Sequence, residues 1–426
     1  MQDLIGDTLS SIVSASVGAV AVLLWNSYRR RFARALDRTS YEYRNREMLG
    51  EHNSAVIDHA VPEFLVDDLS IRDKGQVFKI AMPTESLKRY NTSHKIDRET
   101  QGVVGQIFGS SDLSYLAEIT EIPDIVDRIE RARMRVAQWF EEKTNGCLFN
   151  GIKFGAYRYN FDAVEKGEQR RMSIEVFETD YFTDRVMTEV HRQLLEENPD
   201  HPAGQVERAE SLNSHYFPFF CGIGINAFVL TDNQERIVFS ERSRNVEASN
   251  ASEADISMHV SMNEAVSQSD ISLSPIEDRK ILLNRAFHRG IWEELGLPQG
   301  DPRMGQPHFH SAIVVKNTAQ LGLVCWATFN GTFSELNDLR GKDKFLESNQ
   351  LVSVAFESAA ISKFLKSQKF IPYSRYALWL MTQAWSEVSE RRVRVISTAK
   401  INWPFIKLFI QHFSRNVPTV VYPVQK

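Results

Sequence analysis

Cysteine is scarce in this sequence. Cys147, Cys221 and Cys325 are its three cysteines, and they lie far apart in the chain. This spacing excludes a CxxC zinc pair, and three thiols are too few for a disulfide framework. We therefore expect buried, unbonded cysteines and a chain that lies for the most part in the reducing cytoplasm.

Positive charge is not in excess either. The 426 residues carry a net charge of −5 at pH 7, whereas proteins that bind long nucleic acids neutralise many phosphates with lysine and arginine. Long nucleic acid is therefore not an expected partner, although a small anionic ligand needs only a local basic pocket. The length allows two or three modules, and 42% hydrophobic residues are enough for a packed core.

Charge is absent altogether from one stretch near the N-terminus, Thr8 to Tyr28. Its length matches the roughly 20 residues that cross the hydrocarbon core of a membrane. Arginines follow at 29–31 and 34, whereas the charged residues before the stretch are acidic. Positive flanks stay in the cytoplasm, so we predict one membrane-spanning helix with the N-terminus outside and the bulk of the chain in the cytoplasm. A buried core helix is the alternative.

Small residues recur every four positions along this predicted helix, in two adjacent rows. The rows are Ser10, Ser14 and Gly18, and Ser11, Ala15 and Ala19. In lipid, helices associate through such stripes because their backbones can approach closely. The pattern favours self-association, through which a single helix could act by clustering as well as by anchoring.

Hydrophobic periodicity predicts mixed α and β structure after the anchor. In the middle of the chain we expect an amphipathic helix after Pro123, a hairpin of strands at 151–161 and 171–183, and a helix at 184–197. Farther on we expect strands at 219–231, 236–243, 309–316, 321–333 and 349–356, and helices at 281–297, 357–367 and 371–388.

The helix predicted at 281–297 contains the stretch RGIWEELGL, from Arg289 to Leu297. Arg289, the acids Glu293 and Glu294, and Gly296 resemble the second half of a Nudix box, the motif that holds a divalent metal against a diphosphate. The order of strands and helices over 212–390 is also similar to that of a Nudix domain. The resemblance implies an α+β chain: a single transmembrane helix, then a mixed α/β cytosolic region that ends in a Nudix-like α/β/α sandwich.

The box departs from the family pattern in two ways. Gly290 stands where the pattern has a glutamate, one helical turn before Glu294, and magnesium sites depend on such carboxylates. Without gaps, the first half of the pattern does not match; alternatively the box is split, and HVSMNEAVS (259–267) supplies its early acid, Glu264. Arg289 and Glu293 are four residues apart and are expected to form an ion pair, which leaves Glu294 as the main free acid.

A nucleotide cleft without a complete metal site would need other contacts. Candidates for phosphate are Arg242, His259, His308, His310 and Arg375, and candidates for stacking on bases are Trp326, Phe356 and Tyr373. Trp326 and Phe356 lie in apolar segments, so a place in the core is the alternative. We expect no catalytic residue and no metal site, since His308 and His310 lack an obvious third ligand.

The combination of anchor, middle region and altered box resembles the transmembrane–Nudix effectors of CBASS, the bacterial cyclic-oligonucleotide antiphage signalling systems. The resemblance implies a homo-oligomeric, single-pass protein of the cell inner membrane that senses a cyclic di- or trinucleotide and stops the growth of the infected cell. It implies a receptor and not an enzyme, without a cofactor. The rival is a membrane-tethered, magnesium-dependent Nudix hydrolase of a nucleoside diphosphate derivative; a scaffold protein is a third interpretation.

Four parts of the chain follow from these expectations. Residues 1–34 form the transmembrane anchor and its basic flank, and residues 35–210 form a middle α+β region of unassigned fold. Residues 211–400 form the Nudix-like domain, and residues 401–426 form a C-terminal helix and tail.

Overall fold

The computed structural model describes residues 54–56, 65–66, 68–71, 78–93, 113–142, 150–162, 171–204, 216–242, 257–272, 279–315, 318–339, 348–371, 373–382 and 385. All of them belong to one of the two compact units of the chain, Leu36–Ser386. The predicted membrane helix, Thr8 to Tyr28, and the tail at 401–426 lie outside these ranges. Within the ranges, no helix combines the length and the apolar character that a membrane span requires.

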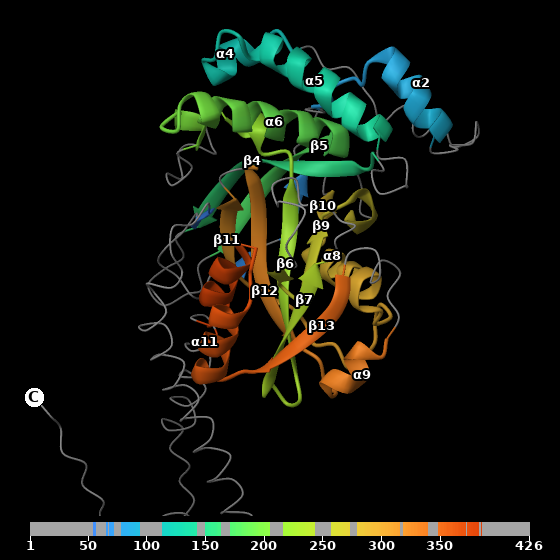
Figure 1. Cartoon of the computed structure of the whole chain (residues 1–426), viewed down its shortest axis with the longest axis vertical. Helices are drawn as coiled ribbons and strands as arrows, with labels where there is room; N and C mark the ends of the chain where they lie inside the picture. Colours follow the sequence, from blue (N-terminus) through green and yellow to red (C-terminus); the bar gives the residue numbers. More distant parts are fainter. Residues whose placement is uncertain are drawn as a thin grey trace, which may run out of the picture. The chain divides into compact units, whose positions relative to one another are not determined.

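The fold is mixed α and β, with two mixed sheets (Figure 1). The larger sheet has a parallel pair, β12 with β6, at its centre, and its other pairs are antiparallel. Its strands in spatial order are β1 (Ser54–Val56), β11 (His308–Val315), β12 (Gln320–Thr328), β6 (Ile223–Thr231), β7 (Arg236–Arg242) and β13 (Ser348–Ala355), with β8 (Met258–His259) on β7 and β9 (Met262–Ala265) on β6.

The smaller sheet is built around a long antiparallel hairpin, which confirms the hairpin predicted in the middle region. Its strands are β10 (Lys280–Ile281), β3 (Leu69–Ile71), β5 (Arg171–Asp180) and β2 (Leu65–Val66), with β4 (Ile152–Asp162) on β5. The helices that precede and follow the hairpin are α2 (Thr84–Ser93), α4 (Leu116–Thr120), α5 (Ile125–Glu142) and α6 (Tyr181–Glu197). They lie together above this sheet in Figure 1.

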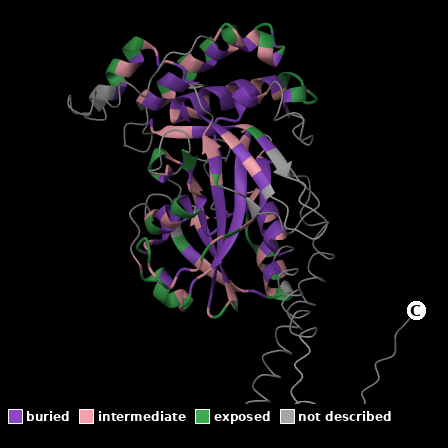
Figure 2. Cartoon of the chain, turned by 180° about the vertical axis from the view of Figure 1, so that it is seen from behind, coloured by how far each residue is buried: buried purple, intermediate pink, exposed green. Residues whose placement is uncertain are grey.

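Both faces of the larger sheet are covered by helices. Successive strand residues point to opposite faces, and so Ala227 and Val229 belong to one buried cluster whereas Phe228 and Leu230 belong to another. Helices α8 (Leu283–Gly290) and α9 (Phe333–Asn337), with the π-helical turn η6 (Ile291–Leu295), contribute to the first cluster; α11 (Ser358–Ser367) and a helix at 373–382 contribute to the second. Figure 2 shows the strands between them as a largely buried layer.

The two sheets exchange strands. β1, from the first part of the chain, extends the larger sheet beside β11, and β10, which leads into α8, pairs with β3 of the smaller sheet. The larger buried cluster accordingly runs from Leu69 to Leu351. The remaining short helices of the described part are η2 (Pro202–Gly204), η3 (Phe217–Phe219) and η4 (Gln268–Asp270).

A short segment splits the β6–β7 hairpin. These two strands pair directly at two positions only, next to their turn. Beyond that point β8 pairs with β7 and β9 pairs with β6, so that residues 258–265, here called the wedge, fill the gap. At its apex the hydroxyl of Ser261 accepts from the amide of Val229 (2.8 Å) and donates to the carbonyl of Val238 (2.5 Å). Ser261 thus provides hydrogen-bond partners for one backbone group of each separated strand.

Asp180 is the N-cap residue of α6 and is fully buried. Its carboxylate accepts from the amide of Thr183 (2.8 Å), as an N-cap does. Burial raises the pKa of Asp180 to about 6, although the contacts with Thr183 and Asn150 and the charge of Lys79 oppose this rise. The folded-state pKa therefore lies above that of an unfolded aspartate, about 3.9.

We predict that Asp180→Asn stabilises the protein at neutral pH. The raised pKa contributes stability that is fully present below about pH 4 and is lost as the pH rises through about 6, because the buried carboxyl must then ionise. About two pKa units correspond to about 3 kcal/mol, and asparagine keeps the cap. Chemical unfolding should show a gain of up to about 3 kcal/mol at pH 7.5 that disappears near pH 4. Asp338→Asn, an exposed change, is the control; a gain independent of pH would contradict the prediction.

Candidate functional site

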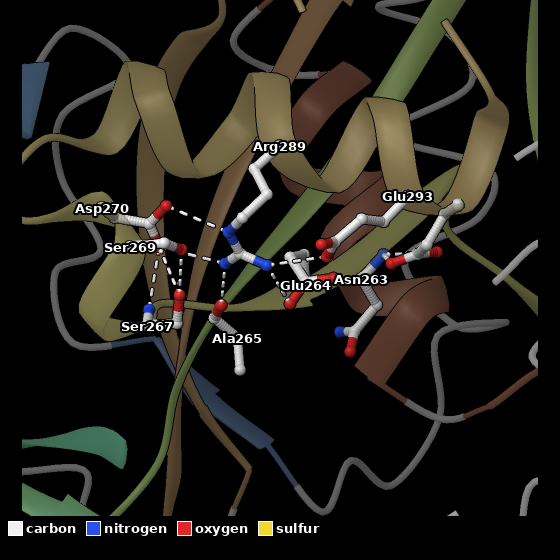
Figure 3. Close-up of polar contacts among 9 residues, drawn as sticks. Asn263, Glu264, Ala265, Ser267, Ser269, Asp270, Arg289 and Glu293 are labelled. Carbon is white, nitrogen blue, oxygen red and sulfur yellow. Dashed lines mark hydrogen bonds and ion pairs between the residues drawn. The ribbon is translucent and has the colours of Figure 1, made fainter. Parts of the chain in front are cut away.

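Arg289, on α8, lies at the centre of a cluster of polar contacts (Figure 3). Its guanidinium has five N–H donors, and five contacts match them. Nε and Nη2 bind the two carboxylate oxygens of Asp270, each at 3.0 Å, and Nη2 also donates to the carbonyl of Ala265 at 2.6 Å. Nη1 contacts both Glu264 and Glu293 at 2.9 Å. The ion pair predicted between Arg289 and Glu293 is therefore confirmed.

Three carboxylates surround this single guanidinium. Burial lowers the pKa of Arg289, but the hydrogen bonds and charges of Asp270 and Glu264 outweigh burial and raise the pKa above its usual range. The fork-to-fork contact with Asp270 is the strongest type of such pair. Arg289 thus stays charged, and the cluster as a whole keeps an excess of negative charge.

The local fold explains how these side chains meet. Ser267 and Asp270 form a capping box around η4, which turns the carboxylate of Asp270 toward α8. Asp68, just before β3, accepts from the backbone amide of Leu283 at 2.9 Å and so caps the start of α8. The wedge brings Glu264 in from the side of β9. Asp270 was not among the residues predicted from the sequence, although a serine three residues before an acid is the capping signal that could have indicated it.

Gly290 lies against the wedge. A Cβ atom at this position would be 2.7 Å from Cβ of Glu264, 2.8 Å from Sδ of Met262 and 2.9 Å from Cγ of Glu264. Such distances are shorter than van der Waals contact, so α8 can approach β9 only with glycine at 290. The side chains of Glu264 and Met262 take the space that any side chain at position 290 would need.

Glu294 is buried rather than free, which corrects the expectation from helical spacing. Its two carboxylate oxygens accept from the amide of Asn263 at 3.0 and 3.2 Å. Asn263 is on β9. Its side-chain amide donates to Asn226 of β6 at 2.7 Å, whereas its backbone amide is the donor to Glu294. The carboxylate therefore satisfies a backbone donor at the outer edge of the wedge. In the described part of the chain, no three His, Cys, Asp or Glu side chains are arranged as metal ligands would be.

The candidate ligand residues lie mostly on the other face of the larger sheet. His259 is buried, and its Nε2 is hydrogen-bonded to the hydroxyl of Tyr373. Trp326 and Phe356 are buried in the second cluster, where both rings contact Trp385, with centroids 4.7 and 5.8 Å away. The rings of Trp326 and Phe356 are thus core residues, as the alternative interpretation had it, and they offer no open face to a base.

Three of the basic candidates, Arg375, His310 and His308, also have contacts within the fold. Arg375 donates to the carbonyls of Leu365 and Gln368 at 3.0 and 3.4 Å, at the end of α11. His310 is buried, and burial lowers its pKa to about 3, so it carries no charge to offer a phosphate. The exposed ring of His308 stacks on Trp326 (4.2 Å between centroids).

The backbone of Arg242 ends β7, opposite Ser348. The structure therefore gathers Arg289, Glu293 and Glu294 on one face of the larger sheet and places His259, Tyr373, Trp326 and Phe356 on the other. The two groups do not share a cleft in the described residues.

No protein-family model matches this chain, and no similar protein was found among curated proteins.

We predict that Gly290→Ala destabilises the protein. Alanine gains about 1 kcal/mol of helix propensity over glycine, but overpacking typically costs about 1–3 kcal/mol. We therefore expect a net loss of up to about 2 kcal/mol in the free energy of unfolding. Asn284→Ala, at an exposed position of the same helix, is the matched control and should be neutral or slightly stabilising. Equal stability of the two variants would show that α8 and the wedge are not in close contact.

Proposed function

We propose that this chain is a membrane-anchored effector of a bacterial CBASS system. In this proposal a Nudix-like domain senses a cyclic di- or trinucleotide, and the chain then oligomerises and disrupts the inner membrane. The observation that supports a receptor over an enzyme is the state of the box acids. Glu264, Asp270 and Glu293 are bound to one guanidinium, and Glu294 is bound to a backbone amide.

The arrangement of layers supports the Nudix-like part of the proposal. The larger sheet has a central parallel pair and helices on both faces, and α8 with its π-helical turn carries the RGIWEELGL stretch along one of them. The turn ends at Gly296, whose φ of 83° is the left-handed conformation that glycine adopts readily. A helix that carries this stretch on one face of a mixed sheet and ends at Gly296 is what a Nudix-like domain would need, and this supports the proposal.

Ligand binding can activate such an effector only through unequal affinity. A nucleotide that binds one arrangement of the chain better than another shifts the chain toward that arrangement. The negative excess around Arg289 repels phosphates at short range, so we place the phosphodiesters beside this cluster and not on it. Clustering of the predicted N-terminal helices would then follow from oligomerisation of the cytosolic part.

One observation favours the hydrolase as a second candidate. The side chain of Glu264 occupies the space in front of Gly290, and so an acid from the wedge stands where the family has an acid from the helix. In the hydrolase interpretation Glu264, Glu293 and Glu294 would have to serve the magnesium ion. As arranged, these carboxylates do not fit that role, because each is engaged by Arg289 or by the amide of Asn263.

A single binding and turnover panel separates the two candidates. The full-length protein in nanodiscs is titrated with cyclic di-AMP, cyclic di-GMP and cyclic triadenylate, and is incubated with ADP-ribose and NADH plus magnesium. We expect micromolar or tighter binding of one cyclic nucleotide, unchanged nucleotide after incubation, and no cleavage of the linear diphosphates. Magnesium-dependent cleavage that is lost in both Glu264→Gln and Glu294→Gln would support the hydrolase instead.

The predicted membrane segment gives a separate test. Removal of residues 1–28 should abolish toxicity in cells that make the activating nucleotide, because the element that acts on the membrane is gone. Binding of the same nucleotide should stay within about threefold of the full chain, since the predicted sensor is untouched. A scrambled segment of equal hydropathy is the control for anchoring alone. Toxicity that survives the deletion would contradict the membrane part of the proposal.

A further inference from the structure

One half of the wedge, β9 (Met262–Ala265), contacts the segment 289–296, here called the box, and is called the box arm below. On β9, the amide of Asn263 is bound by Glu294, and Glu264 is bound by Arg289 at 2.9 Å. Gly290 packs directly on the side chains of Glu264 and Met262. Any ligand that changes the contacts of Glu264 or Glu294 therefore acts on this arm first.

The other half of the wedge, β8 (Met258–His259), binds the connection between α11 and the helix at 373–382, and is called the helix arm below. The amide of Met258 donates to the carbonyl of Lys369 at 2.7 Å, and the carbonyl of Met258 accepts from the amide of Ile371 at 3.1 Å. His259 then binds the hydroxyl of Tyr373, with the two rings edge to face at 5.2 Å between centroids. These contacts fix where the final described helix begins.

The segment between the two arms is short and closely packed. Val260, Ser261 and Met262 are fully buried, and Ser261 is bonded to both strands of the split hairpin. Protein interiors are packed as tightly as organic crystals and transmit displacements rather than absorb them. Five residues, from His259 to Asn263, thus connect two sites on opposite faces of the larger sheet.

We propose that the wedge couples the box to the helix at 373–382. His259 and Tyr373 act as positioning residues in this coupling and not as ligand contacts. A change at Glu264 or Glu294 shifts β9, the shift passes through Ser261 to β8, and the start of the helix moves with it. The coupling itself does not depend on the identity of the ligand; its use in signalling rests on the proposed function.

Hydrogen exchange of the full-length protein, without any nucleotide, tests the coupling. Glu294→Gln weakens the contact on the box arm, and Tyr373→Phe removes the contact on the helix arm. We expect each variant to speed exchange at least about threefold on the opposite arm as well as on its own. The relevant peptides cover 262–266 for the box arm and 366–375 for the helix arm.

Two controls separate coupling from general loss of stability. Tyr376→Phe makes the same chemical change on the same helix, where the ring of Tyr376 stacks on the ring of Trp379. A peptide from β5 reports global unfolding, because this strand belongs to the other sheet. Effects confined to the mutated arm, or equal effects of Tyr373→Phe and Tyr376→Phe on the box arm, would overturn the proposal.

A second experiment tests the role in signalling with the cyclic nucleotide that binds the wild type best. In the wild type, the ligand should change exchange in both 262–266 and 366–382. In Ser261→Ala, which loses both apex hydrogen bonds, binding should stay within about threefold, but the response at 366–382 should be lost. A full response in this variant would overturn the coupling. If none of the cyclic nucleotides binds the wild type, the proposed function fails, whereas the result without nucleotide still decides the coupling.

Discussion

The charge of Arg289 is the constraint on which the box region depends. A buried guanidinium is tolerated only when acceptors surround it, and here they come from three separate segments: β9, η4 and the turn η6. Those segments are therefore fixed relative to α8 by one side chain. Loss of this side chain would leave three carboxylates close together without their counter-charge, a change that typically costs about 3–5 kcal/mol.

Some of this arrangement could be predicted from local pattern. The β4–β5 hairpin, the helix after Pro123, the stop at Gly296 and the ion pair between Arg289 and Glu293 depend on neighbours in sequence, and all are confirmed. Strands of two or three residues such as β2, β3 and β10 carry no periodic signal, since they are defined by their partners. The wedge is likewise set by tertiary pairing, and so the predictions did not include it as strands.

The candidate site was harder to predict than the fold for a physical reason. A strand alternates faces, and a buried aromatic ring on a strand has the same sequence pattern as a ring that stacks on a base. Trp326 and Phe356 belong to the core, and their burial and the packing of Trp385 against them show it. Asp270 was missed because 19 residues separate it from Arg289, a separation that helical spacing cannot bridge.

From the sequence alone, Gly290 had two interpretations: an acid is absent from the helix, or another segment packs closely against the backbone at 290. The structure joins them, because the acid is missing at the point where β9 approaches α8 and Glu264 fills the space. A glutamate placed at position 290 would therefore have no room unless Glu264 and Met262 moved. In the hydrolase alternative, Glu264 would have to leave Arg289 before it could serve a metal ion. A receptor needs no such rearrangement, since its box is required only to hold the wedge and to respond when that hold changes.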